Sequence, residues 1–273
     1  MKRPHVAAAL VASVNSSRKM ENDNNAIHKQ TFRLHSYEVD QRGVARPDIL
    51  LSFMLDSAWG HTRDTEFSYS ELNDEGQLWV LSRFLAVFHD LPKWDDEITV
   101  ETWGKGTDKI FGLRDFMVCS QSEKKFLSAT SAWLIIDRKT SRIQRIDALD
   151  RKFPTQLYRD EIETKLEKIE TRDADKTDFK HVVRSSDLDV NRHVNSSKYL
   201  LWMLDSFPAE YSEKKNLKSF EINFLSEAKL YDEIYVSSMR DESVLSGGEN
   251  FYCEVRRESG DAELCRARIV WND

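Results

Sequence analysis

Residues 96–100 read Asp-Glu-Ile-Thr-Val, and residues 232–236 read Asp-Glu-Ile-Tyr-Val, which is an offset of 136 positions. Residues 54–57, Met-Leu-Asp-Ser, recur as residues 203–206 at an offset of 149. Further pairs at the first offset are Phe84 with Phe220, Phe88 with Phe224, Gly112 with Gly248, and Asp137 with Asp273. Because the matches repeat both in order and in spacing, the sequence indicates two copies of one structural unit.

Each copy is expected to begin with a helix, over residues 47–61 in the first and 195–207 in the second. Pro47 suits the first helical position, and either Asn195 or Ser196 suits an N-cap. Apolar side chains lie almost all round both segments, which is typical of a buried helix. The sequence therefore predicts one buried helix in each copy.

Strand-like runs follow each helix and are separated by short turns. The expected strands cover residues 79–88, 97–103, 112–120 and 129–136 in the first copy, and 219–224, 233–238, 250–257 and 263–271 in the second. Short turns between consecutive strands favour antiparallel pairing. The predicted fold class is therefore α+β, with two antiparallel sheets that each wrap around a long buried helix.

The repeat also predicts how the chain is divided. The segments are a leader over residues 1–26, a first unit over 27–140, a charged linker over 141–180 and a second unit over 181–273. Within the linker, charged residues surround Ile162, Leu166 and Ile169, a pattern that predicts a short amphipathic helix packed along the outside. The leader, with Lys2 and Arg3 before a short Ala-rich stretch, resembles either a weak secretory signal or an over-extended start, and its shortness favours the second.

Composition excludes several classes of function. The chain of 273 residues has 40 Lys and Arg against 47 Asp and Glu, a net charge of −7, which offers no overall attraction to nucleic acid or an anionic membrane. Its three cysteines are too few and too scattered for a disulfide framework, and they suit a reducing cytoplasm. No His or Cys spacing indicates a metal site, and we expect no cofactor.

The candidate site lies just before the second helix. There Asp189, Asn191 and His193 stand on alternate residues, and in an extended segment alternate side chains face one surface. The nearby helix N-terminus supplies N–H groups that suit a developing oxyanion. The two copies also differ at Glu227, whose counterpart at the 136 offset is Leu91. We expect the Glu227 carboxylate to be partly buried. The alternative is that these are turn, capping and structural residues.

Residues 187–195, Asp-Leu-Asp-Val-Asn-Arg-His-Val-Asn, closely resemble the catalytic segment of the acyl-acyl carrier protein thioesterases. The resemblance continues through Tyr199 and Trp202 and covers nearly the whole chain from about Phe32. It implies a tandem hot-dog fold, which agrees with the duplication. It also implies hydrolysis of acyl-acyl carrier protein to free fatty acid and carrier thiol, in fatty acid biosynthesis.

Carried over residue by residue, the resemblance implies that Asp189, Asn191, His193 and Glu227 are catalytic. Glu227 would take a proton from water, with His193 orienting the water or sharing that task. Asn191 would position the water or the thioester carbonyl, and Asp189 would hold Asn191. Plant members have a cysteine after this glutamate, whereas this chain has Ala228, so a cysteine acyl-enzyme is excluded at that position.

The resemblance also implies acyl carrier protein as a partner and an acyl pocket in the first unit, lined from residues 51 to 59. An acidic carrier needs a local basic patch, and the densest basic cluster is Arg138, Lys139, Arg142, Arg145, Arg151 and Lys152. Competing functions are an acyl-CoA thioesterase, a hot-dog hydratase and a non-enzymatic acyl-binding protein. The sequence leaves chain-length preference open, and the state is either a monomer or a homodimer.

Overall fold

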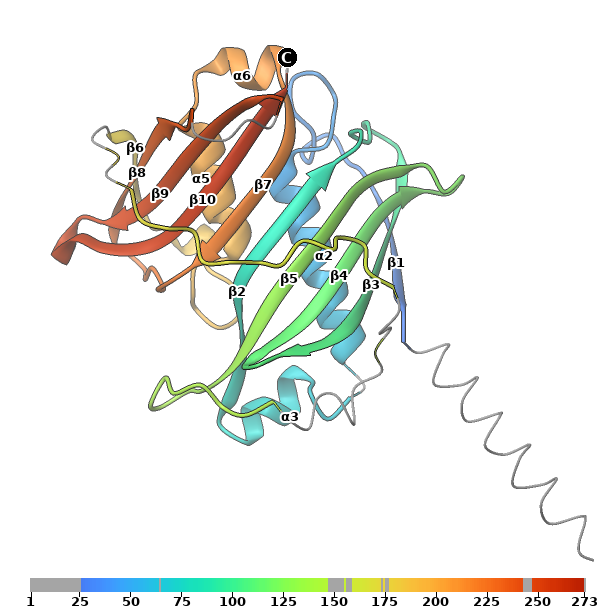
Figure 1. Ribbon diagram of the computed structural model, residues 1–273, viewed down its shortest axis with the longest axis vertical. Coiled ribbons are helices and arrows are strands. Elements are labelled where there is room, and N and C mark those ends of the chain that lie inside the picture. The colour runs from blue at the N-terminus through green and yellow to red at the C-terminus, as the bar shows by residue number, and fades with distance from the viewer. Residues whose placement is uncertain are drawn as a thin grey trace, which may run out of the picture.

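Both copies of the repeat share one antiparallel sheet in the structure, which is a computed structural model (Figure 1). The structure describes residues 26–63, 65–146, 155, 159–172, 174, 177–242 and 247–272. The sheet has ten strands in the order β1-β3-β4-β5-β2-β7-β10-β9-β8-β6. The predicted leader lies outside the described residues except for Ala26.

The first copy forms the first five strands of this order. Its elements are β1 (His28–Arg33), α2 (Pro47–Thr62), α3 (Tyr69–Asp74), β2 (Gln77–Phe88), β3 (Glu97–Asp108), β4 (Phe111–Ser120) and β5 (Lys125–Asp137). The predicted helix and all four predicted strands of this copy are therefore confirmed, with each strand slightly longer than expected. The edge strand β1 and the short helix α3 were not predicted.

The second copy forms the other five strands. Its elements are β6 (Thr177–Val182), η1 (Ser185–Asp187), α5 (Ser196–Asp205), α6 (Ala209–Lys214), β7 (Asn216–Phe224), β8 (Glu233–Arg240), β9 (Glu249–Arg257), η2 (Ser259–Asp261) and β10 (Ala262–Asn272). The helix and four strands predicted for this copy are again confirmed, whereas the edge strand β6 and the helix α6 were not predicted.

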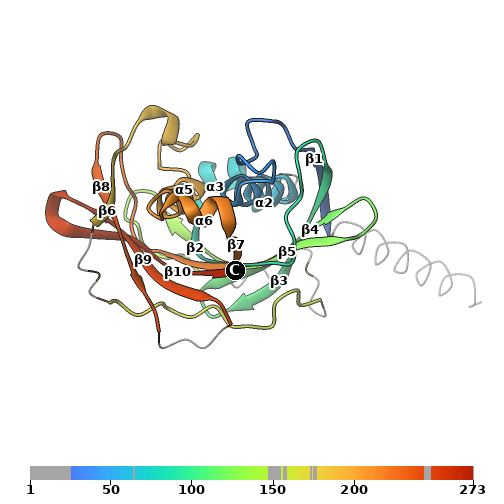
Figure 2. The ribbon, with the colours of Figure 1, turned by 90° about the horizontal axis from the view of Figure 1, so that it is seen from above.

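The central helices α2 and α5 lie side by side on the concave face of the sheet (Figure 2). Leu50, Leu51 and Met54 of α2 are fully buried, as are Leu200 and Met203 of α5. Each helix is thus held by the half of the sheet that belongs to its own copy. This is the tandem hot-dog fold.

The two predicted sheets are joined edge to edge because β2 pairs with β7. In this seam Phe84 lies opposite Ile222, and Ala86 lies opposite Phe220. The rings of Phe84 and Phe220 stack with centroids 5.9 Å apart, and both side chains are fully buried. The same two residues are related by the 136 offset, so the seam joins equivalent strands of the two copies.

Within the predicted linker, the structure describes residues 159–172, where the short amphipathic helix was expected, and they contain no helix, so that prediction was wrong. The segment runs in an irregular, extended path across the face of the sheet opposite the helices (Figures 1 and 2). Polar side chains of the sheet bind its backbone. Asp115 Oδ2 accepts from Glu161 N at 2.8 Å, and Asn223 Oδ1 accepts from Ile169 N at 2.8 Å.

These bonds explain why the apolar pattern of the linker does not form a helix. Backbone groups that the sheet already satisfies gain nothing from helical bonds, and Arg266 also donates to Ile169 O at 2.8 Å. Ile169 still buries its side chain, with 1 % exposed, so the apolar residues pack as expected but on an extended backbone.

The described residues contain three cysteines, for which no disulfide framework was expected. Cys119, Cys253 and Cys265 are all buried free thiols. Among the helices that the structure describes, none combines the length and the apolar character needed to cross a bilayer.

We predict that Phe84→Ala weakens the whole fold. Removing a fully buried ring from the seam loses apolar burial and leaves a cavity, so the free energy of unfolding should fall by about 3–5 kcal/mol. Urea denaturation followed by tryptophan fluorescence measures this. The control is Tyr37→Ala, which removes an aromatic side chain that is 71 % exposed and should change stability little. Equal stability losses in the two variants would contradict the role of the seam.

Candidate active site

Residues 189–193 form a closed turn ahead of α5, not the extended segment that the alternation predicted. Asp189 Oδ1 accepts from Asn191 N at 2.8 Å and from His193 N at 3.2 Å. Asp189 N in turn donates to His193 O at 2.8 Å. Arg192 closes the turn with a φ of 64°, in the left-handed region. The carboxylate of Asp189 is therefore used to hold the backbone of the turn.

The first copy contains the same turn, at the 149 offset. There Asp40 Oδ1 accepts from Arg42 N at 2.8 Å and from Val44 N at 3.2 Å, and Gly43 has a φ of 72°. Asp40 N likewise donates to Val44 O at 2.8 Å. The aspartate thus belongs to the shared architecture of the repeat. What distinguishes the second turn is that Asn191 and His193 replace an arginine and a valine.

His193 meets Glu227, which comes from the loop between β7 and β8. The distance between His193 Nε2 and Glu227 Oε2 is 3.4 Å. The side chain of Glu227 is 44 % exposed, so this carboxylate is more open to solvent than expected. The Glu227 backbone is nevertheless fixed, because its carbonyl accepts from Arg257 Nη2 at 2.6 Å. The fold therefore brings together two predicted site residues that are far apart in the sequence.

A hydrogen bond between Tyr199 of α5 and Ala228 holds the loop that carries Glu227. Ala228 N donates to the hydroxyl of Tyr199 at 3.0 Å, and both residues are buried. Burial raises the pKa of Tyr199 well above its ordinary value, so the phenol stays neutral. Ala228 is fully buried and its methyl side chain cannot act as a nucleophile, so no covalent acyl-enzyme can form at this position.

The start of α5 borders the same region. Asn195 is the N-cap, and its Oδ1 accepts from Ser197 N at 3.0 Å, which decides between the two N-cap candidates that the sequence left open. Asn195 and Ser196 both line the neighbouring cavity. The positive end of the helix dipole therefore lies at the cavity wall.

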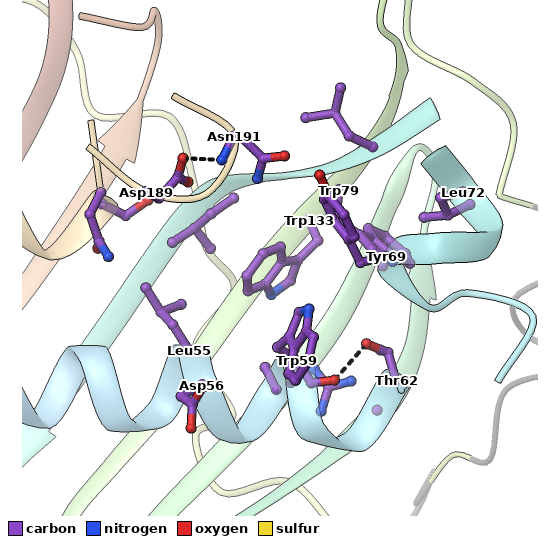
Figure 3. Close-up of a pocket in the computed structure, with 18 of the residues that line it drawn as sticks. Leu55, Asp56, Trp59, Thr62, Tyr69, Leu72, Trp79, Trp133, Asp189 and Asn191 are labelled. Atoms are coloured by element: carbon purple, nitrogen blue, oxygen red, sulfur yellow. Dashed lines mark hydrogen bonds between the residues drawn. The ribbon is translucent and has the colours of Figure 1, made fainter. Parts of the chain in front are cut away.

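An apolar cavity of about 380 Å³ runs beside the turn (Figure 3). Its wall includes Leu55 and Trp59 of α2, Leu72 of α3, and Trp79 and Trp133 of the sheet. In Figure 3, Asp189 and Asn191 lie above one part of the cavity, while Thr62 and Leu72 lie toward its other end. Asp189 and Asn191 are among the lining residues, whereas His193 and Glu227 are not among the described residues that line it.

The lining differs from the predicted segment, residues 51 to 59. Leu51 and Met54 point into the fully buried core, and Leu55, Ala58 and Trp59 form the helical face that lines the cavity. The aromatic contributions from the sheet and from α3 were not predicted. Their only signal in the sequence is the presence of large aromatic residues in strands, which equally suits an ordinary core.

A buried polar group borders the cavity at the end of α2. Arg114 Nη1 lies 3.0 Å from His61 Nδ1 and 3.0 Å from Thr102 Oγ1. Burial lowers the pKa of Arg114 to about 10, so the guanidinium still carries its charge at neutral pH. Because a guanidinium only donates, His61 Nδ1 is the acceptor. The sequence contained no signal for this group.

The predicted basic cluster lies partly against the turn. Arg138 Nη2 donates to Asn191 Oδ1 at 3.1 Å, and another nitrogen of its guanidinium donates to Asn73 Oδ1 of α3. Lys139 and Arg142 are exposed nearby in the sequence. The other described member of the cluster, Arg145, is also exposed, while Arg151 and Lys152 lie outside the described residues.

Comparisons with known proteins agree with the fold and the motif. Residues 25–149 match the family described as the acyl-ACP thioesterase N-terminal domain, and residues 170–273 match its C-terminal domain. The palmitoyl-acyl carrier protein thioesterase of Arabidopsis thaliana is 28 % identical over 90 % of this chain and 64 % of its own length. That of Gossypium hirsutum is 27 % identical over 90 % and 63 %. The chain thus spans slightly less than two thirds of these curated relatives.

Solved structures extend the comparison. An acyl-ACP thioesterase from Bacteroides thetaiotaomicron is 25 % identical, with a TM-score of 0.81, over 92 % of this chain and 99 % of that one. The 12:0-ACP thioesterase from Umbellularia californica is 22 % identical, with a TM-score of 0.77, over 90 % and 94 %. The second likeness concerns the fold alone.

We predict that Asp189→Ala and Asp40→Ala destabilise the protein by similar amounts, about 1–2 kcal/mol each. Both substitutions remove a carboxylate that accepts from two backbone N–H groups of a turn. Urea denaturation measures the loss. Asp189→Asn keeps one amide oxygen as an acceptor and should lose less. An Asp189→Ala variant as stable as the unaltered protein would show that the turn does not need this carboxylate.

Proposed function

The chain belongs to the acyl-acyl carrier protein thioesterase family, and we propose that it hydrolyses the thioester of acyl-loaded acyl carrier protein in fatty acid biosynthesis. The products are a free fatty acid and the carrier thiol. One observation carries this proposal: the turn of residues 189–193 lines an apolar cavity with Asn191 and places His193 3.4 Å from Glu227. An acyl chain fits the apolar wall, and the polar turn meets its thioester.

The reaction uses water as the nucleophile. Glu227 accepts a proton from the water, with His193 orienting the water or sharing the proton. The water oxygen bonds to the thioester carbon, the carbon–sulfur bond then breaks, and the departing sulfur takes up a proton. Because the two side chains lie 3.4 Å apart, the proton taken from the water can pass between them before it reaches the departing sulfur.

Charge develops on the thioester oxygen as the tetrahedral intermediate forms. The cavity wall at the start of α5 offers the amide of Asn191 and the N-terminal end of the helix at Ser196. Donors fixed in advance stabilise such an oxyanion without reorganising. Asp189 contributes indirectly, because its carboxylate fixes the backbone that carries Asn191 and His193.

The same proposal covers the setting of the reaction. The cytoplasm is the proposed location, since three buried free thiols suit a reducing compartment. Acyl carrier protein is the proposed partner, and the exposed Lys139 and Arg142 provide charge for docking an acidic protein. Whether the protein is a monomer or a homodimer stays open.

We predict that Glu227→Gln and His193→Ala each lower kcat by about 10²-fold or more, because either removes one half of the proton-transfer pair. The assay is thiol release from lauroyl- and palmitoyl-acyl carrier protein. Both side chains are partly exposed, so the unfolding midpoint should hardly change. The control is Glu213→Gln, the same chemical change on the exposed face of α6. Normal turnover in either site variant would refute the site, and no thiol release by the unaltered protein would refute the function.

We predict that reversing the charge of the docking patch, with Lys139→Glu and Arg142→Glu together, slows hydrolysis of the carrier-bound substrate selectively. kcat/KM should fall about tenfold for lauroyl-carrier protein, because electrostatic steering is lost, and stay nearly constant for lauroyl-CoA. The matched control, Lys109→Glu with Lys214→Glu, makes an equal charge change on exposed residues elsewhere. Equal slowing of both substrates would contradict docking at this patch.

A further inference from the structure

We propose that Arg138 is a positioning residue that fixes the orientation of the Asn191 amide, so that its NH2 group faces the substrate. The inference rests on the proposed thioesterase function and goes further, because it assigns a role to a residue outside the motif. It also favours one of two tasks for Asn191, because an NH2 group can donate to the thioester carbonyl but cannot accept a hydrogen bond from the attacking water.

The chemistry of the contact carries the argument. An asparagine amide has an accepting oxygen at one end and a donating NH2 group at the other, and rotation by 180° exchanges them. A guanidinium only donates, so Arg138 can bind only the oxygen end. The 3.1 Å contact from Arg138 Nη2 to Asn191 Oδ1 therefore selects one of the two orientations. A thioester carbonyl is an acceptor and needs the NH2 end that this orientation leaves available.

Contacts within the first copy fix the position of Arg138. It directly follows β5, and its backbone N–H donates to Gly76 O at 2.9 Å. Its guanidinium also donates to Asn73 Oδ1 in α3. The side chain thus spans from a fixed site in the first copy to the turn of the second. The turn that carries Asn191 is consequently positioned against the unit that supplies most of the cavity wall.

The equivalent turn of the first copy supports this interpretation. At the 149 offset, Asn191 corresponds to Arg42, which reaches the second copy and donates to Lys215 O at 3.0 Å and to Asn216 Oδ1 at 3.1 Å. Each turn is therefore anchored to the other copy by an arginine. In the first copy the turn supplies that arginine. In the second copy Arg138 of the first unit supplies it. The equivalent position in the turn is therefore free to be Asn191, whose short side chain lines the cavity.

A competing role for Arg138 is docking of the carrier protein, because it belongs to the basic cluster. The two roles can be distinguished by comparing two substrates. Docking concerns the carrier only, whereas orienting Asn191 concerns the reacting carbonyl in every thioester. The measurements therefore use lauroyl-carrier protein and lauroyl-CoA in parallel, with kcat and KM determined for each.

The test compares Arg138→Ala, Arg138→Lys, Asn191→Ala and the double variant Arg138→Ala/Asn191→Ala. We expect Arg138→Ala to lower kcat about tenfold on both thioesters, with KM for lauroyl-CoA nearly unchanged. Arg138→Lys should recover part of the loss, because an ammonium also donates only. In the Asn191→Ala background, removing Arg138 should cause no further fall in kcat on lauroyl-CoA, since Arg138 acts through that amide.

Arg42→Ala is the matched control, because it removes the corresponding anchor of the first copy. It should lower the unfolding midpoint while kcat stays unchanged. A loss of kcat in Arg138→Ala that is confined to carrier-bound substrate would overturn the inference, as would additive losses in the double variant. If the unaltered protein releases no thiol from either substrate, the proposed function itself fails. Full activity of the unaltered protein together with full activity of Arg138→Ala refutes the positioning role alone.

Discussion

The pairing of β2 with β7 is the contact on which the rest of the structure depends. It joins equivalent strands of two copies into one sheet and stacks Phe84 on Phe220 at the centre of the core. Through it, α2 and α5 share one concave face, and the polar turn of the second copy lies against the cavity of the first. A site built from both copies needs their relative position fixed, and a backbone ladder with a buried aromatic seam does so more rigidly than a flexible linker.

Duplication followed by divergence of side chains accounts for the site. Both copies retain the same aspartate-closed turn, with hydrogen bonds of the same pattern and one residue in the left-handed region. The first turn uses its arginine to bind the other copy, while the second carries an asparagine and a histidine beside Glu227. The backbone is therefore a shared scaffold, and the chemistry is confined to a few substitutions on it.

Sequence patterns predicted the elements whose signals are local. The buried helices and the eight strands follow from apolar periodicity and turn residues, and capping chemistry narrowed the N-cap of α5 to Asn195 or Ser196. The edge strands β1 and β6 were missed because they are short and owe their pairing to distant partners. The prediction of a linker helix was wrong for a related reason. Asp115 and Asn223 of the sheet accept hydrogen bonds from backbone N–H groups of the linker, which would otherwise be bonded within a helix.

The sequence by itself determined the duplication, the fold class and the identity of the motif residues, because all of these are written in the order and spacing of residues. Only the tertiary structure decided which groups meet. The approach of Glu227 to His193, the contact of Arg138 with Asn191 and the choice of cavity wall join residues from different elements. Such contacts depend on how the strands pair and where the turn closes, and no local pattern encodes the distance between side chains that are remote in the chain.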